Sequence, residues 1–260
     1  MAIKKHRLAK EVVGMSQKDA TLQTAKKIGA IDQGYQNVKQ AVNNADLVIL
    51  ATPVSIISGM MTMIAPHLKR NCIVTDVGSV KLPIVNVAES KLNGNASFVG
   101  SHPLAGSEKK GVQHASADLF EHCICIMTPT QKTNNSASDR VKKFWLKLGA
   151  KVKFMTPEEH DEILAYVSHL PHVLAYLMMD VIPAQYLEFS AAGLKDSTRI
   201  AGSSPQLWND ICMGNSKNIM KTLDDLVDRL SLIRKSLISQ DSQALTAQFL
   251  AAKEKRDKIE

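Results

Sequence analysis

The feature that most constrains the fold is a regular alternation, between residues 11 and 155, of short β-branched runs with segments of helical periodicity. Parallel strands need a crossover between them, so strands that alternate with helices form a parallel sheet flanked by helices. The sequence therefore predicts an α/β fold with a Rossmann-like, doubly wound, mostly parallel sheet. The expected strands are 11–14, 47–51, 72–76, 97–100, 124–128 and 152–155, and the expected helices are 19–28, 38–44, 56–68, 82–92 and 138–148.

The pattern changes after Thr156-Pro157, and no convincing strand follows. Residues 158–179 are expected to form one long helix interrupted at Pro171, and residues 215–238 carry apolar residues at helical spacing. We therefore predict a dinucleotide-binding domain over residues 1–156 and an all-helical substrate and dimerisation domain over residues 157–260. Leu, Ile and Met occupy more than one face of these helices, which favours a homodimer.

The first residues need separate treatment, because a doubly wound domain begins with a strand, a glycine-rich turn and a helix that holds the pyrophosphate. Residues 1–8 look like the end of that first helix, since the strand 11–14 and the helix 19–28 fit the second unit. We expect the first strand and the glycine-rich loop to be missing, through an internal start or a truncation. Such a chain is expected to bind nicotinamide nucleotides poorly and to be marginally stable.

Composition narrows the class of partner. The net charge is +7, but the lysines are scattered, which indicates a solvated surface or attraction for small anions and not a nucleic-acid interface. No apolar run reaches about 18 residues, and the N-terminus lacks the apolar region of a secretory signal, so we expect a cytoplasmic protein without a membrane span. The four cysteines lie in apolar stretches and are expected to be buried, reduced thiols.

Polar loops follow three of the expected strands. Thr52-Pro53 follows strand 47–51, Val77-Gly78-Ser79 follows strand 72–76, and a loop that begins with Ser101-His102 follows strand 97–100. In open α/β sheets ligands bind outside the carboxyl ends of the strands, so these loops should converge on one cleft. His102, directly after an apolar strand, is the best candidate for a catalytic base.

Two further groups are candidates from the residues alone. His169 and His172 are spaced as metal ligands can be, but no third ligand matches them, and a polar cluster at a helix start explains them as well, so we predict no metal. Arg199 is either a surface cation or the partner of a substrate carboxylate. Its planar guanidinium has the geometry to bind a carboxylate.

Taken together, eight short segments resemble the prephenate/arogenate dehydrogenase family, in its short monofunctional form. They occur in the order and at about the spacing seen there, and the resemblance runs from Met1 to about Lys258. The segments are residues 51–54 (Ala-Thr-Pro-Val), 75–81, 100–108, 119–120, 128–130, 159–161 (Glu-His-Asp), 167–172 and 196–199.

The resemblance implies an oxidoreductase of tyrosine biosynthesis that uses NAD or NADP. It would convert prephenate to 4-hydroxyphenylpyruvate, or arogenate to tyrosine, by oxidative decarboxylation. His102 matches the family's catalytic histidine, and Ser79 matches the serine that hydrogen-bonds this histidine and the substrate hydroxyl. A serine that caps the following helix remains the alternative for Ser79.

The same resemblance assigns the binding residues. Arg199 and His172 match substrate-binding residues, and Ser107 and Glu108 match a gate in which Glu108 pairs with Asp196 or Arg199. For His169 and Trp208, a packing role is at least as good an explanation as contact with the substrate. Near the cofactor the matching residues are Thr52, Pro53, Asp76 and Val77, together with Ser16, which stands near the end of the second strand where an acidic residue would select NAD.

Two alternatives stay open. Another oxidoreductase would share the fold but not the segments around His102 and His172, and a non-catalytic protein that has lost the cofactor loop would bind a ligand or dimerise without turnover. The enzymatic hypothesis requires that His102 and Arg199 face one pocket. With a histidine of ordinary pKa as the base, activity should fall as the pH drops through about 6 to 7.

Overall fold

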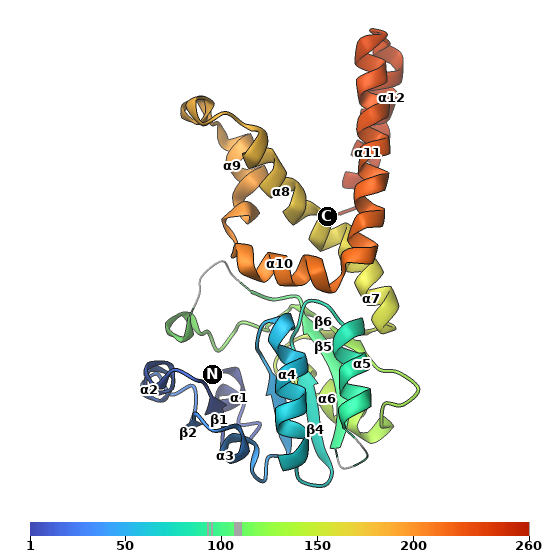
Figure 1. Cartoon of the computed structure of the whole chain (residues 1–260). Helices are drawn as coiled ribbons and strands as arrows, with labels where there is room; N and C mark the ends of the chain where they lie inside the picture. The colour runs from blue at the N-terminus through green and yellow to red at the C-terminus, as the bar shows by residue number, and fades with distance from the viewer. Residues whose placement is uncertain (93, 95, 107–110, 260) are drawn as a thin grey trace. The chain divides into compact units, whose positions relative to one another are not determined.

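The structure is a computed structural model that describes residues 1–92, 94, 96–106 and 111–259. Its contacts divide the chain into two compact units, residues 1–215 and residues 216–260, which are described separately (Figure 1).

The first unit contains two sheets. The strands β1 (Val13–Met15) and β2 (Gln33–Tyr35) form a parallel pair, and five further strands form a sheet in the order β3-β4-β5-β6-β7. In the five-stranded sheet only the pairing of β5 with β6 is antiparallel, so the predicted mostly parallel, Rossmann-like α/β fold is confirmed. The strands of this sheet are β3 (Leu47–Leu50), β4 (Cys72–Asp76), β5 (Ala96–Pro103), β6 (Ile124–Thr128) and β7 (Lys151–Phe154).

The sequence reading was wrong about two strands. It missed β2, whose residues Gln-Gly-Tyr lack a β-branched run and are held in a strand by pairing with β1. It also ended the fifth strand at Gly100, whereas β5 continues to Pro103. The reason is a change of partner: β5 pairs with β4 up to Val99 and with the antiparallel strand β6 from Gly100 onward. His102 therefore lies within a strand and not in a loop after it.

The helices of the α/β part lie close to their predicted positions. The helix α4 begins two residues earlier than predicted and gives way to a 3-10 turn at Ala65–His67, where Pro66 cannot donate a backbone hydrogen bond. Asparagine side chains cap the starts of α3 and α6. The helices are α1 (Ala2–Lys5), α2 (Asp19–Lys27), α3 (Val38–Val42), α4 (Val54–Ile64), α5 (Leu82–Lys91) and α6 (Asn135–Lys147).

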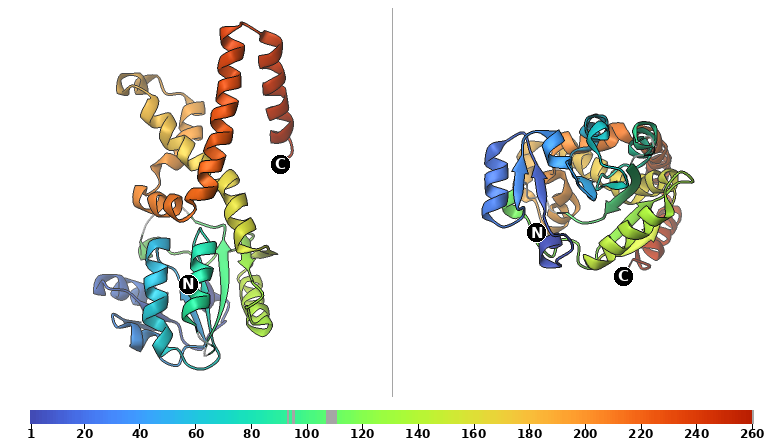
Figure 2. Two further views of the ribbon diagram at one scale, coloured as in Figure 1. Left: turned by 45° about the vertical axis from the view of Figure 1, so that its right-hand side comes forward. Right: turned by 90° about the horizontal axis from the view of Figure 1, so that it is seen from below.

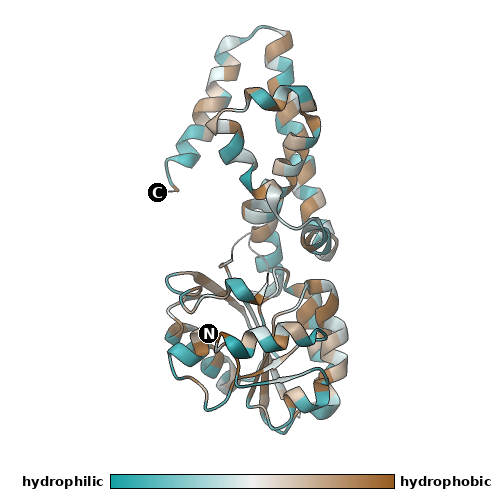
Figure 3. Ribbon diagram, turned by 90° about the vertical axis from the view of Figure 1, so that its left-hand side faces the viewer, coloured by the Kyte–Doolittle hydropathy of each residue, from teal (hydrophilic) through white to brown (hydrophobic). Residues whose placement is uncertain are grey.

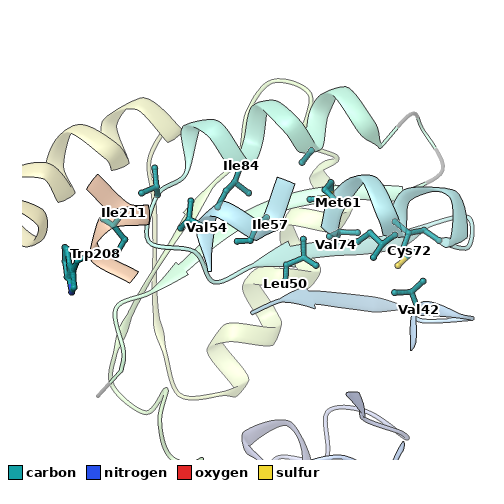
Figure 4. Close-up of a cluster of buried hydrophobic side chains, with 14 residues drawn as sticks. Val42, Leu50, Val54, Ile57, Met61, Cys72, Val74, Ile84, Trp208 and Ile211 are labelled. Carbon is teal, nitrogen blue, oxygen red and sulfur yellow. The ribbon is translucent and has the colours of Figure 1, made fainter. Parts of the chain in front are cut away.

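The core lies on both faces of strand β4, all five residues of which are buried. Alternate side chains of a strand point to opposite faces. Cys72 and Val74 accordingly pack against α4 and α5 (Figure 4), and Ile73 packs into a second cluster that contains Trp145 of α6. Figure 1 shows α4 and α5 side by side over the sheet. This rigid layer fixes the carboxyl ends of β3 and β4.

Helices make up the rest of the first unit. A capping box formed by Thr156 and Glu159 begins α7. The predicted long helix, interrupted at Pro171, is confirmed: residues 157–181 are helical throughout, and the α-helix is interrupted by a π-helical turn at Ala165–His169, just before Pro171. The elements are α7 (Pro157–Leu164), α8 (Leu170–Val181), a 3-10 segment Ala184–Phe189, α9 (Ala192–Thr198), a 3-10 segment Arg199–Gly202 and α10 (Pro205–Gly214).

The second unit is a pair of helices, α11 (Ser216–Ile238) and α12 (Ser242–Arg256), which lie side by side and antiparallel (Figure 2). Asp241 caps the start of α12. Hydrophobic residues recur along these helices (Figure 3), and several are exposed: Met220, Val227, Leu230, Leu237, Phe249 and Leu250. Among the described residues no strand follows Phe154, so the second half of the chain is helical as predicted.

Two other expectations can be compared with the structure. In the part of the chain that it describes, no helix combines the length and the apolar character that crossing a membrane requires.

All four cysteines are free thiols, but only Cys72 and Cys125 are buried, so the expectation of burial was wrong for Cys123 and Cys212. Burial raises the pKa of the Cys72 thiol to about 11 and that of Cys125 to about 12.

We expect Trp145→Ala to lower the free energy of unfolding by about 3–5 kcal/mol, because the side chain is 1% exposed and packs edge-on against Phe120 and Phe144. Urea denaturation measures this loss. The neighbouring Leu146, 48% exposed, supplies the control, since Leu146→Ala should change stability by no more than about 0.5 kcal/mol. Equal effects of the two substitutions would contradict the placement of the core.

Candidate active site

A pocket lies at the carboxyl ends of β3 and β4. Because these strands are parallel neighbours, the loops that follow them adjoin, and they enclose a space of about 270 Å³. Four of the predicted site residues meet there: Thr52, Pro53, Val77 and Ser79. The remaining lining residues are Ala51, Val54, Gly78 and Leu207.

The pocket is mainly apolar with one notable polar group. The Thr52 hydroxyl is buried and has no hydrogen-bond partner among the described residues. Gly78 is needed where it stands, because a Cβ there would lie 2.7 Å from Ile84 and 3.0 Å from the Asp76 carboxylate. An alanine at this position would therefore clash with buried side chains and shift the loop that lines the pocket.

Asp76 supports this loop from inside the protein. Its side chain is fully buried and is ion-paired with Lys81, and it accepts hydrogen bonds from the backbone N–H groups of Gly78 (2.9 Å) and Ser101 (3.1 Å). Lys81 Nζ also donates to the carbonyl oxygen of Ser101 at 2.8 Å. Burial lowers the pKa of Lys81, while Asp76 acts in the opposite direction. Asp76 thus ties β4 to β5 and is not one of the residues that line the pocket.

The His102 ring is buried in the strand β5, with 8% of the residue exposed. Its Nδ1 lies 2.9 Å from Nε2 of His160, and this histidine, not Ser79, is the recorded hydrogen-bond partner of that atom. Burial lowers the pKa of His102 well below its usual range, and the nearby charges of His160, Lys81 and His169 lower it further. His102 is therefore a neutral imidazole at physiological pH, as a proton acceptor must be.

His172 lies at the start of the long helix α8 and is half-buried. Its ring stacks on Trp208 with the centroids 3.6 Å apart, and its Nδ1 donates to the carbonyl oxygen of Ser168 at 3.0 Å. Burial lowers the pKa of His172, the Ser168 carbonyl opposes this, and the positive charge of Arg199 lowers it further. With Nδ1 occupied, Nε2 of His172 remains for a ligand.

The other predicted residues have varied positions. Arg199 and Asp196 are exposed, on the 3-10 segment and on α9, and Ser16 is partly buried and accepts a hydrogen bond from the backbone N–H of Lys18. Ser107 and Glu108 lie outside the described residues. Among the described residues, no three His, Cys, Asp or Glu side chains are placed to hold a metal ion.

Ring contacts and electrostatic interactions lead from His102 toward Arg199, the two groups that the enzymatic hypothesis needs. His102 packs against His160, with ring centroids 5.1 Å apart, and the charge of His169 acts on His102. The ring of His169 packs edge-on against Trp208, with centroids 6.1 Å apart. Trp208 stacks on His172, and the positive charge of Arg199 lowers the pKa of His172. It stays a prediction that His102 and Arg199 face one pocket. The ring contacts and electrostatic interactions between them support it.

The sequence did not single out Lys81, His160 and Asp161 as candidate site residues. They stood only inside quoted segments, and nothing in their spacing showed that they would meet His102 and Asp76. Asp161 stands among Glu158, Glu159 and Glu162 in α7, so the local sequence gives no signal that singles it out.

A mostly parallel sheet with a pocket at the carboxyl ends of its strands is the arrangement in which proteins of the Rossmann type bind nucleotides. Residues 1–154 match the family model described as "Prephenate dehydrogenase, nucleotide-binding domain", and residues 156–251 match "Prephenate dehydrogenase, dimerization domain". The chain belongs to the prephenate dehydrogenase family.

Individual relatives agree with this assignment. The chain is 35% identical to prephenate dehydrogenase of Bacillus subtilis over 99% of its own length and 71% of the relative's, and 34% identical to cyclohexadienyl dehydrogenase of Zymomonas mobilis over 86% and 79%. Among solved structures, prephenate dehydrogenase of A. aeolicus in complex with hydroxyphenyl propionate and NAD+ superposes with a TM-score of 0.93 at 30% identity, covering 100% of this chain and 92% of that one. The family resemblance predicted from the sequence is confirmed.

The lowered pKa of His102 corrects the pH dependence expected from the sequence. Since the free imidazole is already neutral well below pH 6.5, activity should persist below pH 6 and should not fall through 6 to 7. The measurement is kcat/KM as a function of pH. An inflection near pH 6.5 that belongs to His102 would contradict the burial described above.

Proposed function

We propose that this chain catalyses the oxidative decarboxylation of prephenate, or of arogenate, with NAD or NADP as hydride acceptor, in tyrosine biosynthesis. The observation that carries the proposal is the buried, neutral His102 on β5, the strand next to β4, whose carboxyl end forms the pocket, in a chain of this family. The alternative of a non-catalytic protein is not favoured, because the family match extends over both halves of the chain.

The strand-end pocket fits the nicotinamide end of the cofactor. A planar ring suits its apolar lining of Pro53, Val54, Val77 and Leu207, and the unpartnered Thr52 hydroxyl suits the ring's amide group. When bound, the nicotinamide supplies one piece of chemistry, the acceptance of a hydride. Ser16 stands close to the end of β1, where an acidic residue would favour NAD, so both NAD and NADP remain in the proposal.

In the proposed reaction His102 Nε2 accepts the proton of the substrate's ring hydroxyl. At the same time a hydride leaves the ring carbon that bears this hydroxyl. The ring carboxylate then departs as CO2, and the electron pair of the broken bond enters the ring, which becomes a phenolate. The proton held by His102 returns to the phenolate oxygen. Aromatisation drives the reaction, so the residues of the protein need only position the substrate and move this proton.

Arg199 and His172 are proposed to hold the substrate. A guanidinium can bind a carboxylate through two parallel hydrogen bonds, and Nε2 of His172 is available beside it. Ser79, in the pocket wall, is proposed to contact the substrate hydroxyl. Ser107 and Glu108 are proposed as a gate at the mouth of the cleft, in which Glu108 pairs with Asp196 or Arg199. The net charge of +7 favours the approach of a dianionic substrate.

The helical half is proposed to form a homodimer, as the description of the second family match suggests. Exposed apolar side chains on α11, such as Val227 (58%) and Leu230 (54%), would be covered in such an interface. Cytoplasmic action is part of the proposal, and so is the division into domains at residues 156 and 157.

The test is an assay of nicotinamide reduction with prephenate and arogenate, each with NAD and NADP. His102→Asn should lower kcat by about 10²- to 10⁴-fold and leave KM nearly unchanged, because asparagine keeps a hydrogen bond but accepts no proton. His67→Asn, at an exposed histidine of the 3-10 turn, is the matched control and should keep full activity. Inactivity of the unaltered protein with all four combinations would refute the proposal.

A further inference from the structure

The helix α7 contributes two buried polar residues that have no part in the proposed function. His160 is fully buried and Asp161 is 2% exposed. The two rings of His102 and His160 and the carboxylate of Asp161 form one hydrogen-bonded line. Nδ1 of His102 lies 2.9 Å from Nε2 of His160, and Nδ1 of His160 lies 2.8 Å from Oδ1 of Asp161.

The contacts of Asp161 give this line its direction. The backbone N–H of Lys81 donates to Oδ1 at 2.8 Å, and that of Leu82 donates to Oδ2 at 2.9 Å. A backbone N–H can only donate, and both groups belong to the N-terminus of the ten-residue helix α5, which favours a negative charge. Asp161 is therefore held as a carboxylate that accepts, and the hydrogen between it and His160 belongs to Nδ1 of His160.

The remaining hydrogens follow from the chemistry of a neutral imidazole, which carries one N–H and one lone pair. With its hydrogen on Nδ1, His160 presents a lone pair on Nε2, and this lone pair must accept from Nδ1–H of His102. His102 is then left with its lone pair on Nε2. Burial lowers the pKa of both histidines, which keeps both rings neutral.

We propose that His160 and Asp161 are positioning residues that hold His102 in the tautomer whose Nε2 accepts a proton, and that stabilise the imidazolium formed when it does. The inference rests on the proposed function, in which that proton comes from the substrate hydroxyl. Without the line, the His102 ring could carry its hydrogen on either nitrogen, and in one of the two forms Nε2 could accept nothing.

Among the surrounding charges, that of Asp161 is the one that can stabilise the imidazolium of His102. The titratable groups that act on the two histidines are Asp76 from β4, Lys81 from the loop after it, Asp161 from α7 and His169 from the π-helical turn. Lys81 and Asp76 form an ion pair, so their charges largely offset each other, and His169 is a buried histidine whose pKa burial lowers to about 4. The carboxylate of Asp161 is thus the negative charge in line with His102.

Asp161→Asn tests the proposal, because it removes the negative charge that stabilises the imidazolium, while the amide oxygen can still accept from the backbone N–H of Lys81. We expect kcat to fall by about 10²- to 10⁴-fold with KM within about threefold. The loss should lessen as the pH rises. Glu158→Gln, at an exposed acidic residue of the same helix, should change neither constant.

A second pair of variants keeps the test decisive if Asp161→Asn fails to fold. In His160→Gln the amide oxygen can accept from His102 while its NH₂ donates to Asp161, so this variant should retain at least about tenfold more activity than His160→Leu. Thermal unfolding of both variants shows whether they are folded. Equal activity of folded Gln and Leu variants would overturn the proposal, since a merely structural role does not depend on hydrogen-bond direction.

Nitrogen NMR of the ¹⁵N-labelled histidines in the unaltered protein, without substrate, reads the tautomer directly. We expect a protonated Nδ1 and an unprotonated Nε2 for His102. Hydrogen on Nε2 of His102 in the unaltered protein would refute the proposal. This readout needs no turnover, so an inactive protein with the expected tautomer would count against the proposed function, and an active protein with the opposite tautomer against the present inference.

Discussion

The contact on which the site depends is the carboxylate of Asp161 at the N-terminus of α5. Two backbone N–H groups, of Lys81 and Leu82, donate to its two oxygens and so fasten the first helix of the helical half to the loop after β4. That loop carries Val77, Gly78 and Ser79 of the pocket. One buried anion therefore fixes the loop, the helix α7 and, through His160, the ring of His102.

The position of His102 is set from a second direction by the sheet. Because β5 changes partner from β4 to β6 at Gly100, His102 is held by strand pairing and not by a loop. Its neighbour Ser101 is bound through its N–H to Asp76 and through its carbonyl to Lys81. Burial and the nearby positive groups keep this histidine neutral, which suits a base.

Much of the fold could be predicted from the sequence, because periodicity is a local property. Strand β4 and the helices α5 and α11 were located within a residue or two from the spacing of their apolar residues. The strand β2 and the end of β5 could not be located, because pairing with another strand and not their own residues makes them strands. Pro171 was a useful local signal, since the α-helix is interrupted by a π-helical turn just before it.

The candidate site was predictable where it followed strand ends and the family's motifs, as at Thr52, Val77 and His102. The line from His102 to Asp161 was not, since 58 residues separate the two histidines and only the folded chain brings them together. A crystal structure of the protein with the cofactor and a hydroxyphenyl product analogue tests the account most directly. The account predicts the phenolic oxygen within hydrogen-bond distance of His102 Nε2 and the carboxylate of the same molecule against Arg199. A ligand that binds elsewhere, or that contacts Arg199 with His102 Nε2 turned away from it, would contradict the account.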